Sequence, residues 1–311
     1  LYIGHYRIIM ISVKNLFKSF NGFQAVNDLS FDIMPGDVVG FLGPNGAGKS
    51  TTMKMLTGFL LPTSGDIHIS NLSLNQSALE IKKKIGYLPE GAPAYGDMTP
   101  LQFLNFIAQI RGYKGAEKAA RIQKVIEQVE LQEVLDRPID NLSKGFKRRV
   151  GLAQALIHDP EILILDEPTD GLDPNQKHQV RELIKNLSKD KIVIISTHIL
   201  EEVTAVCNRV MIIAKGKLLF DDTPKALKRR SRYYGAVTLY FSYRADASEL
   251  GELEGVAEME EDLVTGRVTL FPKPSAEILH LVTAYIQRCK LPVDSLYVEQ
   301  GSLDLVFRQI T

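Results

Sequence analysis

One short stretch of the sequence combines the residue types that bind phosphate groups. It fits the pattern G-x-x-x-x-G-K-[S/T] and comprises Gly43, Pro44, Asn45, Gly46, Ala47, Gly48, Lys49, Ser50 and Thr51. Glycines let successive backbone N–H groups turn inward around phosphate oxygens, a lysine neutralises the β- and γ-phosphates, and a serine hydroxyl can bind Mg²⁺. The stretch therefore predicts a site for a nucleoside triphosphate and its magnesium ion.

The residues on either side provide the elements that such a loop needs. The apolar run Val38–Leu42 comes before it and predicts a buried strand, and a helix that carries Met53, Met55 and Leu56 follows it. The N-terminus of that helix adds positive potential where the phosphates would lie. The alternative is a tight strand-to-helix turn with a surface lysine, which needs no ligand.

Two more apolar runs end next to groups that can do acid–base chemistry. Asp166 and Glu167 follow the run Ile162–Leu165, and His198 follows the run Ile192–Ser196. Taken alone, these residues have ordinary explanations. The acidic pair could cap a helix, and the histidine could be a plain hydrogen-bonded side chain.

Five motifs in this order resemble those of the ATP-binding cassette (ABC) family, and they cover roughly residues 11–220. Besides the phosphate-binding stretch, residues 142–146 (LSKGF) resemble the family signature sequence, and residues 162–167 (ILILDE) resemble its Walker B strand. Residues 170–173 (DGLD) resemble its D-loop, and His198 stands where the family has its switch histidine. The resemblance implies an ATPase that uses ATP and Mg²⁺.

The resemblance also implies a role for each polar group. Asp166 would hold Mg²⁺ through water, and Ser50 would bind the same ion. Glu167 would polarise the attacking water, and His198 would donate to the γ-phosphate and sense its loss. Together these residues would form the catalytic half of an ATP site.

The signature residues imply that two chains work together. Ser143 and Gly145 would present a hydroxyl, N–H groups and a helix N-terminus to the γ-phosphate held by the opposite subunit. Lys144 replaces a signature glycine and would add a cation there, and Phe146 replaces the usual glutamine. Two cassettes, identical or similar, would thus sandwich two ATP molecules. Ser143 would cap the following helix in any case.

Two sets of residues are harder to assign: those that would contact the adenine base, and the loop that would couple ATP hydrolysis to the membrane partner. Phe20 stands where the family has an aromatic ring that stacks on adenine, and Val26 would line the same pocket; the alternative for Phe20 is a core position. The loop that usually carries a glutamine reads GYLPE and ends in Glu90. Glu90 would either contact Mg²⁺ or face the membrane partner from an exposed loop. These variants resemble a branch of drug, polysaccharide and gliding-motility export ATPases.

The pattern of elements predicts an α/β cassette of the P-loop type over residues 10–223. Strand signals vanish between about residues 91 and 158, where helical periodicity predicts a helical subdomain. The remainder, residues 224–311, predicts strands and helices in the order β-α-β-β-α-β, which is typical of a small ferredoxin-like α+β domain. We expect it to be an accessory or regulatory domain.

The composition indicates where in the cell the protein works and which partners it has. Lys and Arg number 37, as do Asp and Glu, so no net field favours nucleic acid. Two cysteines and the absence of a long apolar run indicate a cytoplasmic protein, and residues 1–9 do not resemble a secretion signal. We expect it at the inner face of the membrane, bound to a separate permease that it energises for export. The alternative is a soluble ABC ATPase that works as a switch.

Overall fold

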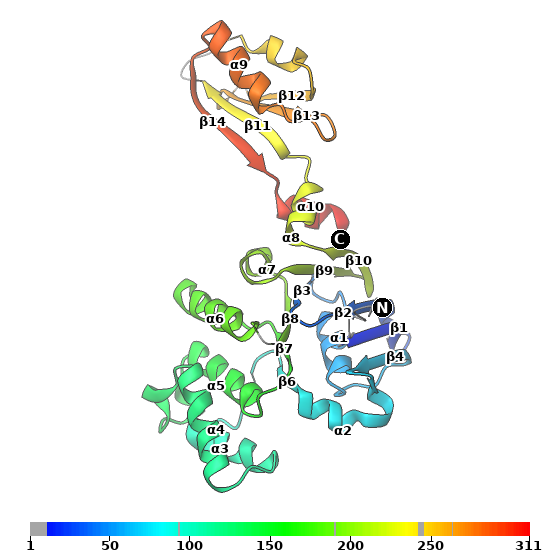
Figure 1. Ribbon diagram of the computed structural model, residues 1–311, viewed down its shortest axis with the longest axis vertical. Helices are drawn as coiled ribbons and strands as arrows, with labels where there is room; N and C mark the ends of the chain where they lie inside the picture. The colour runs from blue at the N-terminus through cyan, green and yellow to red at the C-terminus, as the bar shows by residue number, and fades with distance from the viewer. Residues whose placement is uncertain (1–10, 93, 190, 242–245, 263) are drawn as a thin grey trace, which may run out of the picture. The chain divides into compact units, whose positions relative to one another are not determined.

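The computed structural model describes residues 11–92, 94–189, 191–241, 246–262 and 264–311 (Figure 1). Met10, at which the cassette was expected to begin, lies outside these residues. The chain divides into two compact units, one ending at Asp222 and a second comprising Thr223–Ile310.

The first unit is built on a six-stranded sheet in the order β10-β9-β3-β8-β7-β6. Its strands are β3 (Val38–Leu42), β6 (Ile85–Leu88), β7 (Ile162–Asp166), β8 (Ile192–Thr197), β9 (Arg209–Ala214) and β10 (Lys217–Asp222). All neighbours pair in parallel except β9 and β10. Every residue of β3, β7 and β8 is buried, because their continuous apolar runs have both faces covered.

A second sheet of the same unit was not foreseen in the sequence. It is antiparallel, in the order β2-β1-β4-β5, and consists of β1 (Ile11–Phe20), β2 (Phe23–Ile33), β4 (Ser64–Ile69) and β5 (Leu72–Ser73). In the second half of β2 buried and exposed residues alternate, the pattern of a strand that packs one face on the core. One core cluster includes residues of both sheets and of α1 (Lys49–Leu56).

The first unit contains α-helices and short 3₁₀ helices besides its two sheets. Besides α1 they are α2 (Leu74–Lys84), α3 (Pro100–Ile110), α4 (Gly115–Gln128), α5 (Lys144–Leu156), α6 (Pro174–Leu187) and α7 (Leu200–Val206), with short 3₁₀ helices η1 (Gln132–Val134) and η2 (Ile139–Asn141). The described residues from 91 to 158 contain helices and no strand. Thr99 and Gln102 form a reciprocal capping box that fixes the start of α3.

The second unit has the strand order of a split βαβ fold, with one departure. Its antiparallel sheet β12-β13-β11-β14 comprises β11 (Tyr234–Phe241), β12 (Val256–Asp262), β13 (Arg267–Pro272) and β14 (Val293–Gln300). Its helices are α8 (Pro224–Arg229), α9 (Leu279–Cys289) and α10 (Leu303–Ile310). The first helix expected between its strands is only a 3₁₀ turn, η3 (Ser248–Glu252), since five residues are too few to sustain an α-helix.

Candidate functional site

The phosphate-binding loop joins the carboxyl end of β3 to the N-terminus of α1. Gly46 and Gly48 have φ angles of 78° and 105°, which L side chains rarely adopt. A Cβ on Gly43 would lie 2.3 Å from the Ile213 carbonyl oxygen, and one on Gly48 would lie 2.5 Å from the Ala25 carbonyl oxygen. The loop therefore needs glycine at these positions, and its shape is that of a cradle for an anion at a helix N-terminus.

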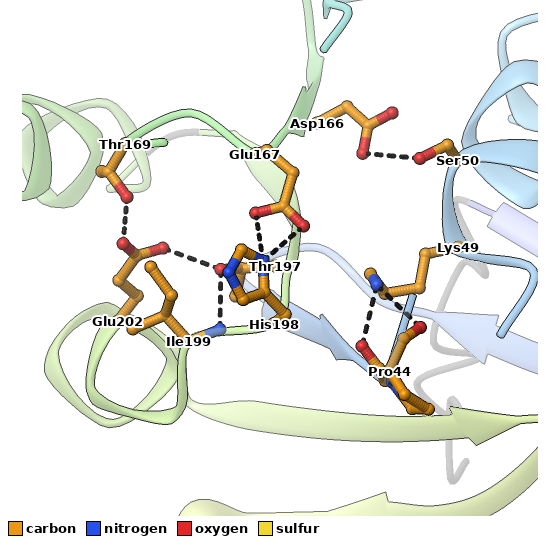
Figure 2. A network of polar contacts seen from close by, with 11 residues as sticks. Pro44, Lys49, Ser50, Asp166, Glu167, Thr169, Thr197, His198, Ile199 and Glu202 are labelled. Atoms are coloured by element: carbon orange, nitrogen blue, oxygen red, sulfur yellow. Dashed lines mark hydrogen bonds and ion pairs between the residues drawn. The ribbon is translucent and has the colours of Figure 1, made fainter. Parts of the chain in front are cut away.

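The side chain of Lys49 lies against this loop. Its Nζ donates to the carbonyl oxygens of Gly43, at 2.8 Å, and Pro44, at 3.2 Å (Figure 2). Burial lowers the pKa of Lys49, while the neighbouring carboxylates, that of Glu167 foremost, act to raise it. These contacts hold the ammonium at the loop where phosphates would bind.

Ser50 and Asp166 meet although 116 residues separate them in the chain. The Ser50 hydroxyl donates to Asp166 Oδ1 at 3.3 Å. The other oxygen, Oδ2, is buried and has no hydrogen-bond partner among the described residues. A buried carboxylate oxygen without a donor, beside a serine hydroxyl at the phosphate loop, fits the oxygen ligands that Mg²⁺ prefers. These two residues could therefore hold the metal.

Glu167 and His198 lie face to face beside the loop (Figure 2). His198 Nδ1 is 3.0 Å from each carboxylate oxygen of Glu167. Glu167 has a φ of 49°, and its N–H donates to the Ser196 carbonyl oxygen at 2.9 Å. Burial raises the pKa of Glu167, and the hydrogen bond from His198 opposes that rise. A carboxylate with this environment can accept a proton from water.

A buried carboxylate that sequence reasoning missed ties the surrounding loops together. Glu202, on α7, accepts hydrogen bonds from the hydroxyls of Thr169 and, at 2.9 Å, Thr197 (Figure 2). Thr197 Oγ1 in turn accepts from the Ile199 N–H at 3.1 Å. Thr169 follows the Walker B strand by three residues, and Thr197 precedes His198, so Glu202 links the two segments that carry the reacting side chains. The only sequence signal for Glu202 was its position four residues after His198. By itself, a glutamate at such a position looks like an exposed residue on a surface helix.

The remaining predicted residues are spread around this centre. Glu90 lies on an exposed turn after β6, near enough to act on the pKa values of Lys49 and Tyr87. Ser143 caps α5, its Oγ accepting from the Phe146 N–H at 3.4 Å. A Cβ on Gly145 would lie 2.7 Å from the Gln176 side chain, and one on Gly171 would lie 3.2 Å from the Lys144 side chain.

The two residues predicted for adenine differ in exposure. Phe20 ends β1 with 43% of its surface exposed, and Lys18 Nζ lies 5.1 Å from its ring centroid. Val26 is 1% exposed and packs in the core next to Gly48. Phe20 thus offers a free aromatic surface, whereas Val26 has almost no surface left for a ligand in this structure.

The fold and these groups define a P-loop nucleoside triphosphatase. A family model described as ABC transporter matches residues 26–170. The chain is 38% identical over 223 residues to the ABC transporter ATP-binding protein YxlF of Bacillus subtilis, covering 72% of this chain and 74% of that protein. It is 40% identical over 227 residues to the bacitracin transport ATP-binding protein BcrA of Bacillus licheniformis, covering 72% and 73%.

The cassette also resembles solved structures. The dimeric cassette MJ0796, in a post-hydrolysis state bound to ADP and Pi, superposes with a TM-score of 0.64 at 26% identity, covering 69% of this chain and 98% of that one. The chain belongs to the ABC transporter family and is an ATP-binding, ATP-hydrolysing subunit of such a transporter. The resemblance predicted from the motifs is confirmed. Within the described residues, no helix has the length and apolar character to cross a bilayer.

Proposed function

We propose that this chain binds MgATP at the loop 43–51, hydrolyses it with Glu167 as the general base, and energises export by a separate permease. The observation that supports the site most strongly is the convergence of Lys49, Ser50 and Asp166 with the Glu167–His198 pair, from three segments of one chain. The chain is also 34% identical over 219 residues to the Nod factor export ATP-binding protein I of Cupriavidus metallidurans, which supports export as the direction.

Some of these residues bind MgATP, and others take part in its hydrolysis. Backbone N–H groups of the loop and the N-terminus of α1 bind the phosphates, and Lys49 leaves its carbonyl partners to neutralise their charge. Ser50 and Asp166 would hold Mg²⁺, which when bound offsets the charge on the phosphate oxygens. Glu167 accepts a proton from the attacking water, and His198 keeps that carboxylate oriented.

We propose that the second half of each ATP site comes from another cassette. Ser143 and Gly145 stand at the N-terminus of the 13-residue helix α5, where backbone N–H groups can bind an anion. The dimeric form of the related cassette supports this arrangement.

A large apolar groove supports docking of the permease. It has a volume of about 1010 Å³, and residues of α1, α2, β6 and α3 are among those that line it. Phe59 and Leu79 line it and are each 77% exposed. Its charged lining residues are all basic: Lys54, Lys82, Lys83 and Arg111. The groove thus suits a short amphipathic cytoplasmic helix with an acidic flank, which would hold the chain at the inner face of the membrane.

The test is co-purification with a membrane protein of about six spans encoded beside this chain. Leu79→Glu places a charge in the groove and should abolish co-purification while basal ATP hydrolysis stays within about twofold, because Leu79 lies outside the ATP site. Val264→Glu is the matched control, since Val264 is 94% exposed in the second unit, and it should leave co-purification intact. Undiminished capture of the permease by Leu79→Glu would contradict docking at this groove.

A further inference from the structure

An arginine on α5, the helix that begins in the signature sequence, joins three segments of the cassette. Arg149 keeps only 13% of its side chain exposed. Its Nη1 donates to the Glu130 carboxylate at 2.7 Å and to the Val129 carbonyl oxygen at 3.0 Å, at the end of α4. Its Nη2 donates to Gln179 Oε1, on α6, at 2.5 Å. One planar, forked cation thus ties α5 to two other helices through different nitrogens.

An aromatic ring flanks this guanidinium. Phe146, which stands where the family has a glutamine, lies three residues before Arg149 and therefore on the same face of α5. The guanidinium carbon is 5.8 Å from the centroid of the Phe146 ring, within the range of a cation–π contact. The ring thus restricts the directions that the Arg149 side chain can take and favours the one that reaches α6.

Helices α5 and α6 also meet nearer their N-termini. A Cβ on Gly145 would lie 2.7 Å from the side chain of Gln176, so these two residues pack against each other. Arg149 follows Gly145 by about one turn of α5. Gln179 follows Gln176 by about one turn of α6. The two contacts therefore run in the same direction along both helices, and the first turn of α5 lies beside the first turn of α6.

Each of these first turns is connected to the ATP site. The first turn of α5 contains the signature residues. Helix α6 begins directly after residues 170–173, and Asp173 caps it by accepting from the Gln176 N–H at 2.9 Å. Residues 170–173 are in turn joined to the proposed general base, since the Asp170 N–H donates to the Glu167 carbonyl oxygen at 3.3 Å. A shift of α5 against α6 would therefore move the signature residues relative to the catalytic segment of the same chain.

We propose that Arg149 is a positioning residue: by holding α5 to α6 it fixes the signature turn in the orientation that receives the ATP of the second cassette. This role rests on the proposed function, in which the signature residues complete an ATP site on another chain. The hydrogen bonds that the structure describes for Arg149 go to the end of α4 and to α6. It therefore acts on ATP through the helices that it joins, and its loss should weaken the pairing of two chains rather than the binding of ATP by one.

The first measurement is how tightly two full chains associate in MgATP. In a Glu167→Gln background, Arg149→Met and Gln179→Ala should each raise the dimer dissociation constant about tenfold, because a displaced signature turn contacts ATP less well. Combining the two changes should add less than about twofold to Arg149→Met alone, since both remove the same bond. Arg121→Met is the matched control. Its ion pair with Glu117 lies within α4, so it should change the constant less than about twofold.

ATP affinity separates positioning from a general loss of structure. At chain concentrations too low for pairing, Arg149→Met should bind ATP within about twofold of the parent, because its contacts lie outside the phosphate loop. Gln179 is exposed, and alanine favours a helix, so Gln179→Ala tests the same bond in a chain that folds. An unchanged dimer dissociation constant in Gln179→Ala would overturn the proposal, as would effects of the two changes that simply multiply.

Hydrogen–deuterium exchange without nucleotide tests the bond independently of pairing. The amides to follow are the capped ones in the two first turns, Phe146 N–H and Gln176 N–H. Arg149→Met and Gln179→Ala should each speed exchange there about fivefold, because the two turns are no longer held together. Unchanged exchange in both variants would overturn the proposal whatever the chains do in MgATP. A Glu167→Gln chain that stays monomeric in MgATP, with exchange altered as expected, would instead contradict the proposed pairing of cassettes.

Discussion

At the scale of single residues, the reacting carboxylate is held in a backbone conformation that costs energy. The left-handed φ of Glu167 costs about 1–2 kcal/mol for a residue with a Cβ. The N–H bond to Ser196 and the contact with His198 maintain it. Strain of this kind persists where the surrounding structure fixes it, and here the carboxylate lies against the His198 ring.

The pKa of Glu167 gives the rate of hydrolysis a defined pH dependence. A general base acts only when ionised, so a raised pKa moves the acid limb of kcat/KM above the pH expected for an ordinary glutamate. His198 holds that pKa down through its hydrogen bond, so the residual activity of His198→Ala should show an acid limb at still higher pH. Rate profiles of parent and variant check this, and a limb that stays in place or moves to lower pH would contradict it.

Glu202 should act on catalysis through its two threonines. Glu202→Ala leaves the hydroxyls of Thr169 and Thr197 without their buried acceptor and should lower kcat about tenfold, with little change in KM. Glu202→Gln can still bond both hydroxyls and should stay within about threefold of the parent. Steady-state kinetics of the two variants distinguish this from a loss of charge, in which case both would be impaired equally.

At the scale of elements, the sequence predicted the parts that carry local signals. The strand, loop and helix from Val38 to Leu56 are as predicted. Their signals, an apolar run and a glycine-rich turn, each lie within a few consecutive residues. The division of the cassette into two sheets was not predictable in this way, since it depends on which distant strands pair. Glu202 was missed for the same reason: it acquires its role from the threonine side chains that only folding brings near it.

The phosphate loop should depend on glycine for its shape rather than for general stability. Gly46 and Gly112 both have positive φ and open space where a Cβ would be, so an alanine at either strains the backbone by about 1 kcal/mol. Gly46→Ala should in addition weaken ATP binding about tenfold, because the altered loop turns N–H groups away from the phosphates. Gly112→Ala should bind ATP as the parent does. Equal affinities in titrations of both variants would argue against the cradle.

At the scale of the whole molecule, the second unit contains its own core. Its buried residues, among them Val237, Leu239 and Leu270, form a cluster separate from that of the cassette. We therefore expect a chain that ends at Asp222 to fold, bind ATP and hydrolyse it at the basal rate, since every proposed phosphate-contacting residue comes before that point. Nucleotide affinity and ATPase rate of the truncated and full chains test this. A truncated chain that is folded by circular dichroism but does not bind ATP would contradict the independence of the two units.

The central claim is that two cassettes close around ATP bound at the loop 43–51 and that Glu167 then drives hydrolysis. Its most direct test is the mass of Glu167→Gln in MgATP, measured by light scattering after size exclusion. The amide hydrogen-bonds water but cannot accept its proton, so ATP should remain bound and the variant should elute at twice the mass of one chain. Adding Lys49→Ala, which removes the loop cation, should return it to a monomer. A Glu167→Gln chain that stays monomeric in MgATP while hydrolysing it at the parental rate would contradict the account.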